Sequence, residues 1–377
     1  MNKAIKYRLY PTTEQCVMFA KTFGCCRKVY NLMLSDKIRS YQETGRFVSV
    51  TPAMYKEDYP YLREVDSLAL ANVQLNLQRA FKACFDKSRK KRNGFSKFKS
   101  AKHSRKAYTT NNQHGTVVIM ERAIKLPKIG RVKAVIHRVP DTDWILKSVT
   151  VSQEPDGRYY ASVLFEYRNT VTKVPVSDSV IGLDYASDGL YVDDQGNTGS
   201  HHKYYRESHA KLAKAQRRLS HMQGSQKGET KSCNYIKQLR KVNKIHRHIV
   251  NQRLDHLHKL STETANHRYD IVCAESLNMR SMANKGFGNG KATMDNGYGL
   301  FLDMLEYKLA DRGKYLVRVD KWYKSSQICH RCGIRHPEMK DLRIRTMRCS
   351  CGLVMNRDQN AAINIRQEGL RMLMEAA

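Results

Sequence analysis

The first ten residues alternate between hydrophobic and polar side chains, and the spacing then becomes helical. Along residues 3–10 the alternation predicts a strand, which Pro11 ends. Thr12 and Gln15 have the spacing of a capping box, and hydrophobic residues then recur every three or four positions. A mostly helical segment is therefore expected to about residue 90, and its clearest helix covers residues 68–85.

Shorter alternating stretches, separated by turn residues, continue to about residue 168 and predict several strands. We expect these strands at residues 117–120, 134–137, 149–151 and 159–165. The strand at residues 3–10 is expected to join them in the same sheet. The result would be a small β-barrel that is interrupted by the helical segment.

The second half of the chain alternates strongly hydrophobic strands with long helices. The expected strands cover residues 180–186, 189–192, 270–277 and 315–319, with a further short strand at 198–203. The expected helices cover residues 206–222, 233–260, 301–312 and 358–372. This order of elements is that of an RNase H-like fold, so the predicted fold class is α+β with several domains.

The charge of the chain indicates a polyanionic partner. Its 377 residues carry 67 Lys and Arg against 35 Asp and Glu, a formal net charge of +32. Repulsion of this size favours a nucleic-acid partner, with a ribosome-associated or merely soluble basic protein as the alternative. There is no apolar run of about 18 residues and no secretory signal, so we expect a cytoplasmic protein.

Two regions concentrate this charge. Residues 86–106 contain ten Lys or Arg among 21 residues, with Phe95 and Phe98 interleaved, which favours a nucleic-acid surface over a solvated loop. Residues 203–259 contain fifteen Lys or Arg and three acids, which favours a helical hairpin that follows a duplex over a bare coiled coil. The polar side of the helix at 68–85 favours a solvated face, with contact to DNA base edges as the alternative.

Four cysteines near the C-terminus have the spacing of metal ligands. Cys329 and Cys332 form one pair, and Cys349 and Cys351 form a second pair after sixteen residues. Two such pairs can meet at one tetrahedral ion, which predicts structural Zn²⁺, with iron as the alternative. The second pair is one residue shorter than the usual Cys-x-x-Cys. The other six cysteines lie in mostly apolar segments and are expected in the core.

Three acids occupy corresponding elements of the second half. Asp184 lies inside an apolar strand, Glu275 ends a later strand, and Asp358 begins the last helix. A single acid in a strand is often structural, but three acids that converge from two central strands and a helix can hold two Mg²⁺ ions. Because two such ions hydrolyse phosphodiester bonds, the three acids predict a nuclease site.

Several short motifs carry a family resemblance. They are KYRLYPT at residues 6–12, GFSKFK at 94–99, YTTN at 108–111, IGLD at 181–184, NQRLDHLHKLST at 251–262, AESLN at 274–278, SSQIC at 325–329 and RDQNAA at 357–362. In these motifs most of the chain resembles TnpB, the RNA-guided endonuclease of small insertion sequences, which is similar to compact type V CRISPR effectors.

The resemblance implies a domain organisation and two metal sites. A wedge-type β-barrel would comprise residues 1–10 and 105–175, interrupted by a helical recognition domain at 11–104. A RuvC-like nuclease domain would cover 176–377, with a zinc-ribbon insertion at 324–355. The Asp–Glu–Asp triad of the family corresponds to Asp184, Glu275 and Asp358, and the ribbon corresponds to the four clustered cysteines.

The resemblance also implies the partners. They are a guide RNA derived from the transposon end and double-stranded target DNA beside a short motif, without a membrane or a small-molecule substrate. We expect a monomer. We also expect it to cleave DNA, because all three acids are present. The alternatives are a nuclease-inactive RNA-guided repressor and a DNA transposase that joins strands.

Candidate nucleic-acid contacts are polar, basic or aromatic residues of the regions named above. They are Gln74, Asn76, Gln78, Arg79, Lys97, Phe98, Lys99, Arg105, Thr110, Asn111, Arg217, Arg218, Arg240, Arg253, Ser326, Gln327 and Arg357.

Overall fold

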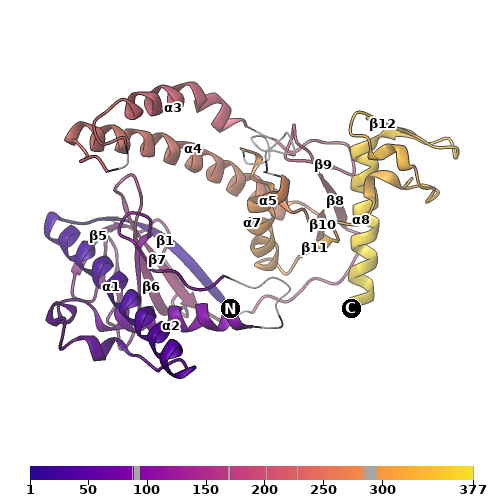
Figure 1. Cartoon of the computed structure of the whole chain (residues 1–377). Helices are drawn as coiled ribbons and strands as arrows, with labels where there is room; N and C mark the ends of the chain where they lie inside the picture. Colours follow the sequence, from indigo (N-terminus) through magenta and orange to yellow (C-terminus); the bar gives the residue numbers. More distant parts are fainter. Residues whose placement is uncertain are drawn as a thin grey trace. The chain divides into compact units, whose positions relative to one another are not determined.

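The chain folds as two compact units (Figure 1). The computed structural model describes residues 1–86, 88, 94–168, 170–200, 202–226, 228–282, 284 and 295–376, so part of the basic stretch at 86–106 lies outside the described residues. The first unit covers Met1–Asn169 and the second covers Thr170–Ala377. Each unit has hydrophobic clusters of its own.

An antiparallel sheet of seven strands forms the β part of the first unit. The order of its strands is β2-β6-β7-β1-β5-β4-β3. The two edge strands, β2 and β3, do not pair with each other, so the sheet is an open half-barrel. The strands are β1 (Asn2–Tyr10), β2 (Lys106–Asn111), β3 (Val118–Met120), β4 (Ala123–Leu126), β5 (Gly130–Val135), β6 (Ile145–Gln153) and β7 (Tyr159–Glu166). The first strand joins this sheet as predicted, and it lies between β7 and β5.

One predicted strand of this sheet is shifted. The strand expected at 134–137 begins at Gly130 instead, because a tight turn at Lys128 and Gly130, both with positive φ, returns the chain directly from β4. The alternation in β4 is only four residues long, too short to stand out against the turn residues around it.

Two long helices pack against this sheet. They are α1 (Thr13–Thr44) and α2 (Ser67–Phe85), and the short 3-10 helices η1 (Pro52–Tyr55) and η2 (Pro60–Arg63) lie between them. The predicted capping box at Thr12 and Gln15 is present. Helices and strands share one hydrophobic cluster, in which the Phe19 ring lies 5.3 Å from that of Tyr159. The helical segment therefore has its core in common with the sheet.

The second unit contains a mixed sheet of four strands in the order β11-β10-β8-β9. The strands are β8 (Val180–Tyr185), β9 (Tyr191–Asp193), β10 (Ile271–Glu275) and β11 (Tyr315–Val319). β10 is parallel to both β8 and β11, and β9 is antiparallel to β8. β8 and β10 are buried along most of their length, as expected for central strands that are covered on both faces.

The further strand that was expected at 198–203 is reduced to one isolated bridge between Val192 and Thr198. Gly199 and Ser200 follow, and they add little hydrophobic surface to hold a strand against the sheet.

The helices of the second unit include a long antiparallel hairpin (Figure 1). They are α3 (Tyr204–Ser220), α4 (Cys233–Asn266), α5 (Met279–Met282), α7 (Tyr298–Ala310) and α8 (Arg357–Ala376). In the hairpin of α3 and α4, Leu212 and Ala215 pack against Val242, Ile245 and Ile249. No helix among the described residues combines the length and the hydrophobicity that crossing a membrane requires.

A small module precedes α8 and has its own hydrophobic cluster, which includes Met339, Met347 and Leu353. It contains the short 3-10 helices η4 (Ser325–Gln327) and η5 (Pro337–Lys340) and the hairpin of β12 (Thr346–Arg348) and β13 (Val354–Asn356). The module is continuous with α8, because β13 ends where the helix begins.

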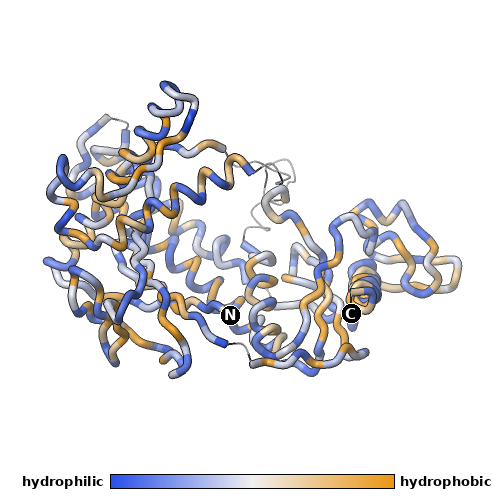
Figure 2. The backbone as a smooth tube through the Cα atoms, turned by 90° about the horizontal axis from the view of Figure 1, so that it is seen from below, coloured by the Kyte–Doolittle hydropathy of each residue, from blue (hydrophilic) through white to orange (hydrophobic). Residues whose placement is uncertain are grey.

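Helix α8 lies directly on one face of the four-stranded sheet, and Figure 2 shows hydrophobic strands beside the helix that ends at the C-terminus. A Cβ atom on Gly182 of β8 would lie 2.0 Å from the Ala362 carbonyl oxygen. A Cβ atom on Gly369 of α8 would lie 2.4 Å from the Cys273 sulfur. These two glycines allow the helix to approach the sheet more closely than any side chain would permit.

We expect Gly182→Ala to lower the thermal midpoint of unfolding by several degrees. The added methyl group meets backbone, which cannot move aside as a side chain does, and overpacking of this kind costs about 1–3 kcal/mol. Gly299→Ala in α7 is the matched control, because its Cβ would lie at an ordinary 3.5 Å from Met279 Cγ. Equal midpoints for the two variants in calorimetry would contradict the close packing of α8.

Candidate active site and metal-binding thiols

Two of the predicted acids lie at the ends of neighbouring parallel strands. Leu183 of β8 lies opposite Ala274 of β10, so the residues that follow them, Asp184 and Glu275, are neighbours. Side chains alternate between the faces of a strand, and both acids fall on the same face as the Gly182 position that contacts α8. The sheet therefore directs both carboxyl groups to the same end of the same face.

Helix α8 supplies the third acid. Asp358 is its second residue, and the side chain of Asn356 accepts hydrogen bonds from the backbone amides of Asp358 at 2.8 Å and Gln359 at 3.3 Å. A side chain that accepts such bonds fixes where a helix begins. The carboxylate of Asp358 also accepts a hydrogen bond from Arg345 at 3.4 Å. The start of the helix thus sets the position of this acid.

All three acids line one cavity of about 1010 Å³ in the second unit. The remaining lining is rich in positive charge, which comes from Lys321, Lys324, Arg335, Lys340, Arg343, Arg345 and Arg357. Ser326 and Gln327, both predicted contacts, lie on the same wall. Basic side chains can hold the phosphates of a nucleic acid, and a group of acids beside them can hold metal ions at one phosphate.

Burial and repulsion raise the pKa values of the two strand acids. Burial, followed by the charges of Glu275 and Asp358, raises the pKa of Asp184 well above its usual range, and Arg357 opposes that shift. Burial raises the pKa of Glu275 to about 7. Arg357 is itself buried, and its Nε and Nη1 atoms have no hydrogen-bond partner within the described chain. The cluster concentrates negative charge in a poorly solvated place, which favours the binding of cations.

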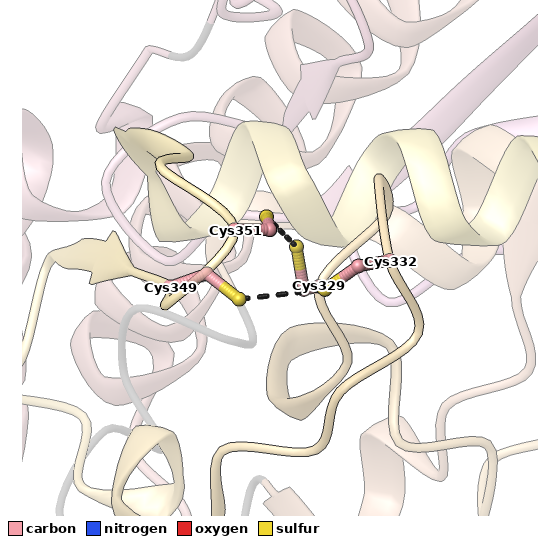
Figure 3. A group of neighbouring side chains, drawn as sticks. All are labelled: Cys329, Cys332, Cys349 and Cys351. Carbon is pink, nitrogen blue, oxygen red and sulfur yellow. Dashed lines mark hydrogen bonds between the residues drawn. The ribbon is translucent and has the colours of Figure 1, made fainter.

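The four clustered cysteines converge as predicted (Figure 3). The sulfur of Cys329 lies 3.7 Å from that of Cys351, and the sulfur of Cys332 lies 3.4 Å from that of Cys349. Four thiolates around one tetrahedral ion, with metal–sulfur bonds of about 2.3 Å, have sulfur–sulfur edges of about 3.8 Å. The residues therefore fit one metal ion, and the shortened second pair reaches it.

The environment of one thiol also favours metal binding. The backbone amide of Cys351, followed by His336 and the neighbouring thiols, lowers the pKa of Cys349. Against the backbone amide of Ile334, burial and hydrogen bonds to the other thiols raise the pKa of Cys332. The thiolate is the form that binds metal ions.

The acids are spaced more widely than the thiols. In the part of the chain that the structure describes, the thiols are the only group of three or more His, Cys, Asp or Glu side chains close enough to hold one ion. Carboxylates repel one another, and two ions that lie about 3.5–4 Å apart need a wider set of ligands than one ion.

Two buried asparagines of α8 connect the thiol module to the acids, and the motif-based reading did not assign them a role. Asn360 donates a hydrogen bond to the Ile328 carbonyl and accepts one from the amide of His330. Asn364 donates to the carbonyls of Ile328 and Ser325. Their spacing of four residues places them on one side of the helix, which is the signal in the sequence that could have identified them.

The predicted nucleic-acid contacts differ in exposure. Ten of them are exposed side chains, namely Asn76, Gln78, Arg79, Lys97, Phe98, Lys99, Arg105, Arg217, Arg218 and Arg240. Gln74 and Asn111 are partly buried. Of the two interleaved aromatic residues, Phe95 packs with its ring 5.3 Å from that of Phe81 and still leaves 44% of its surface exposed.

Three of these predicted contacts lie in other settings. Thr110 is completely buried, because its side chain lies on the inner face of β2. The prediction that it contacts nucleic acid is therefore wrong, and its side chain packs in the core. Arg253 pairs with the buried Asp295 at 3.1 Å. Arg357 lies inside the acid-lined cavity.

Glu275→Gln is expected to stabilise the metal-free protein at high pH. Between its ordinary pKa of 4.5 and its raised pKa of about 7, the folded carboxyl binds a proton that the unfolded chain has released. The contribution of the Glu275 carboxyl to the free energy of unfolding therefore falls as pH rises through this window. Gln cannot ionise, so the variant does not lose this stability.

The measurement is the thermal midpoint in chelator at pH 5 and pH 8. The variant should exceed the parent by several degrees at pH 8 and by little at pH 5. Glu263→Gln, at an exposed acid of α4, is the control. A difference between Glu275→Gln and the parent that does not change with pH would contradict the raised pKa.

Comparisons with known proteins match most of the chain. Family models match residues 1–46 ("Helix-turn-helix domain"), 148–285 ("Probable transposase") and 298–365 ("Cas12f1-like, TNB domain"). In this structure residues 1–46 form β1 and the single long helix α1. A solved structure, the cryo-EM Cas12f1–sgRNA–target DNA complex, matches 97% of this chain and 98% of its own with a TM-score of 0.50 and 12% identity, a likeness of fold.

Two curated relatives match nearly the full length. InsQ of Escherichia coli K12, named "Putative RNA-guided DNA endonuclease InsQ", is 27% identical over 98% of this chain and 93% of its own. A "Putative RNA-guided DNA endonuclease" of Streptomyces pristinaespiralis is 34% identical over 98% of this chain and 90% of its own. Identity at that level over almost all of both proteins shows that the chain belongs to the TnpB family of RNA-guided DNA endonucleases.

Proposed function

We propose that this protein is an RNA-guided endonuclease that cleaves double-stranded DNA beside a short motif, as part of a transposable element. The observation that carries the proposal is the shared cavity of Asp184, Glu275 and Asp358, whose walls are basic. The second unit is then an RNase H-like domain of the RuvC type. The names and lengths of the curated relatives support the same activity.

The residues fit two divalent cations of the Mg²⁺ type. Asp184, Glu275 and Asp358 are the residues that would hold these ions. Carboxylate oxygens are the ligands that Mg²⁺ prefers. The pKa values of Asp184 and Glu275 are raised because burial penalises their charged forms, a penalty that bound cations would offset. When bound, the ions would activate a water molecule and stabilise the departing 3′ oxygen.

The other cavity residues position the substrate. Lys324 and Arg335 line the wall from which the phosphates of a single strand can be held. Ser326 and Gln327 of η4 lie on the same wall, and the hydrogen bonds of Asn364 to Ser325 and Ile328 fix that segment. The buried Arg357 offsets part of the acidic charge, so the cavity accepts a phosphate beside the carboxylates.

The thiol module would hold one structural Zn²⁺. Four thiolates close the coordination of the ion, which leaves no open position for a substrate. A bound ion would therefore fix the two Cys turns against the start of α8. Through Asn360, which bonds to His330 beside the first Cys pair, the module also supports the helix that carries Asp358.

The charge of the chain supports RNA and DNA as partners. Guide pairing would read the target sequence, so the protein itself needs mainly backbone contacts and a short motif. The exposed Arg217, Arg218 and Arg240 of the α3–α4 hairpin provide such contacts. We propose that the protein acts as a monomer in the cytoplasm, with residues 1–10 and 105–175 as wedge, 11–104 as recognition domain and 324–355 as zinc ribbon.

Asp184→Ala is expected to abolish cleavage while target binding persists. Removing one ligand of two ions should lower the rate by at least about a thousandfold, whereas guide pairing and backbone contacts do not involve this carboxyl. The measurement is the cleavage rate and the DNA affinity of the protein bound to its guide RNA. Asp255→Ala, at an exposed acid of α4 that pairs with Lys259, is the matched control.

Three outcomes would redirect the proposal. Continued cutting by Asp184→Ala would eliminate the triad. Binding without Mg²⁺-dependent cutting by the parent protein would favour the nuclease-inactive repressor. Purification without RNA, together with joining of DNA ends, would favour the transposase, the function that the family description of residues 148–285 names.

Cys349→Ala is expected to reduce bound zinc from about one ion per chain to nearly none and to lower the thermal midpoint. Three thiolates leave the site open, and closed zinc sites contribute folding free energy directly. Zinc is measured by mass spectrometry of the purified protein. Cys233→Ala, at an exposed cysteine outside the module, should keep both values. Iron in place of zinc in the parent protein would contradict the assignment of the metal.

A further inference from the structure

One large aromatic residue on the cavity wall has no role in the mechanism above. Trp322 is 77% exposed, although it lines the same cavity as the three acids. It lies three residues after Val319, which is opposite Glu275 in the β10–β11 pair. The ring is therefore presented at the same end of the sheet as the acids. An indole exposed to this extent loses the burial that would otherwise stabilise it.

The loop holds Trp322 in place from both sides. Its backbone amide donates a hydrogen bond to the Asp320 side chain at 2.8 Å, and the next amide, that of Tyr323, donates to the Asp320 carbonyl at 3.0 Å. Tyr323 is partly buried and packs against the hydrophobic cluster that includes Val319 and Ile365, although it too lines the cavity. The packing of Tyr323 and the hydrogen bonds to Asp320 fix the backbone on either side of Trp322, whose side chain stays exposed.

The neighbours of the ring suit a nucleotide. The ammonium group of Lys321 lies 4.8 Å from the centre of the indole ring, a cation–π distance. Lys324 follows two residues later on the same wall. Cations that hold phosphates beside an exposed ring are the two components of single-strand binding sites, in which bases stack on aromatic side chains.

We propose that Trp322 is a stacking platform for one base of the single strand that enters the cavity, next to the phosphate that is cut. It is a positioning residue, because it would hold a base and thereby place the phosphate at the acids. Stacking does not depend on base identity, so the platform suits an enzyme whose sequence specificity comes from a guide. The inference rests on the proposed nuclease function and assigns a binding role within it.

The first experiment measures stacking without cleavage. The chain contains two tryptophans, and Trp144 is packed with its ring 4.9 Å from that of Tyr167 in the first unit, so Trp144→Phe leaves Trp322 as the sole indole reporter. The full chain with its guide RNA is titrated with oligothymidine in Ca²⁺ in place of Mg²⁺. Quenching of Trp322 fluorescence is expected, and an abasic oligonucleotide of equal length should bind without it.

The second experiment couples the residue to the base. Target DNA carries a single abasic position, moved one nucleotide at a time around the cut. For the parent protein, one position should slow cleavage about tenfold, the size of one stacking contact. Trp322→Ala should slow cleavage of intact DNA equally, and the abasic position should then add nothing. Trp322→Phe should retain most of the rate, and target affinity should stay constant throughout.

The outcomes separate this inference from the proposed function. A parent protein that cuts normally, with no quenching and with additive effects of the abasic position and Trp322→Ala, would overturn the platform and leave the nuclease intact. Loss of rate in Trp322→Ala without coupling to any abasic position would assign the ring to the stability of its own loop and also overturn the inference. Quenching by base-bearing DNA, in a protein that does not cut, would support stacking and reject the nuclease.

Discussion

The close contact between α8 and the central strands of the second sheet is the constraint on which the candidate active site depends. Asp358 reaches Asp184 and Glu275 only because the helix lies almost against the backbone of β8, where Gly182 leaves room for the Ala362 carbonyl. The same helix anchors the segment after β11 through Asn360 and Asn364. One packing contact therefore positions both the third acid and the wall that faces the three acids.

The two candidate metal sites relate to stability in opposite ways. The acids are partly buried beside one another, so their charged forms cost free energy in the unliganded fold, and binding of cations would reduce that cost. The thiols form a closed group with a small cluster of its own, where a bound ion adds to stability. A site that admits a substrate keeps charged groups that the fold alone does not neutralise. A site that only supports the structure can have all of its ligands occupied by one ion. Both sites contact α8, so the thiol module can help to keep Asp358 in position despite the repulsion among the acids.

Much of this arrangement was predictable from local patterns. The alternation at residues 3–10, the capping box at Thr12 and the paired cysteines each follow from short-range chemistry, and the structure confirms them. The burial of Thr110 and the role of Asn364 were not predictable, because both depend on which element packs against the residue. The short strand β4 and the loss of the strand at 198–203 reflect sheet pairing, which a single segment does not specify.

The central place of β1 has a consequence for biosynthesis. Among the strands of its sheet β1 is synthesised before the others, yet its partner β7 begins at Tyr159, about 150 residues later. At typical elongation rates the interval is roughly 8–30 s, and the β7 edge of β1 lacks its partner throughout it. The partner on the other edge, β5, is made somewhat earlier. The seven-stranded sheet can therefore be completed only after most of the first unit has been translated, and the β7 edge of β1 must not pair with another strand before then.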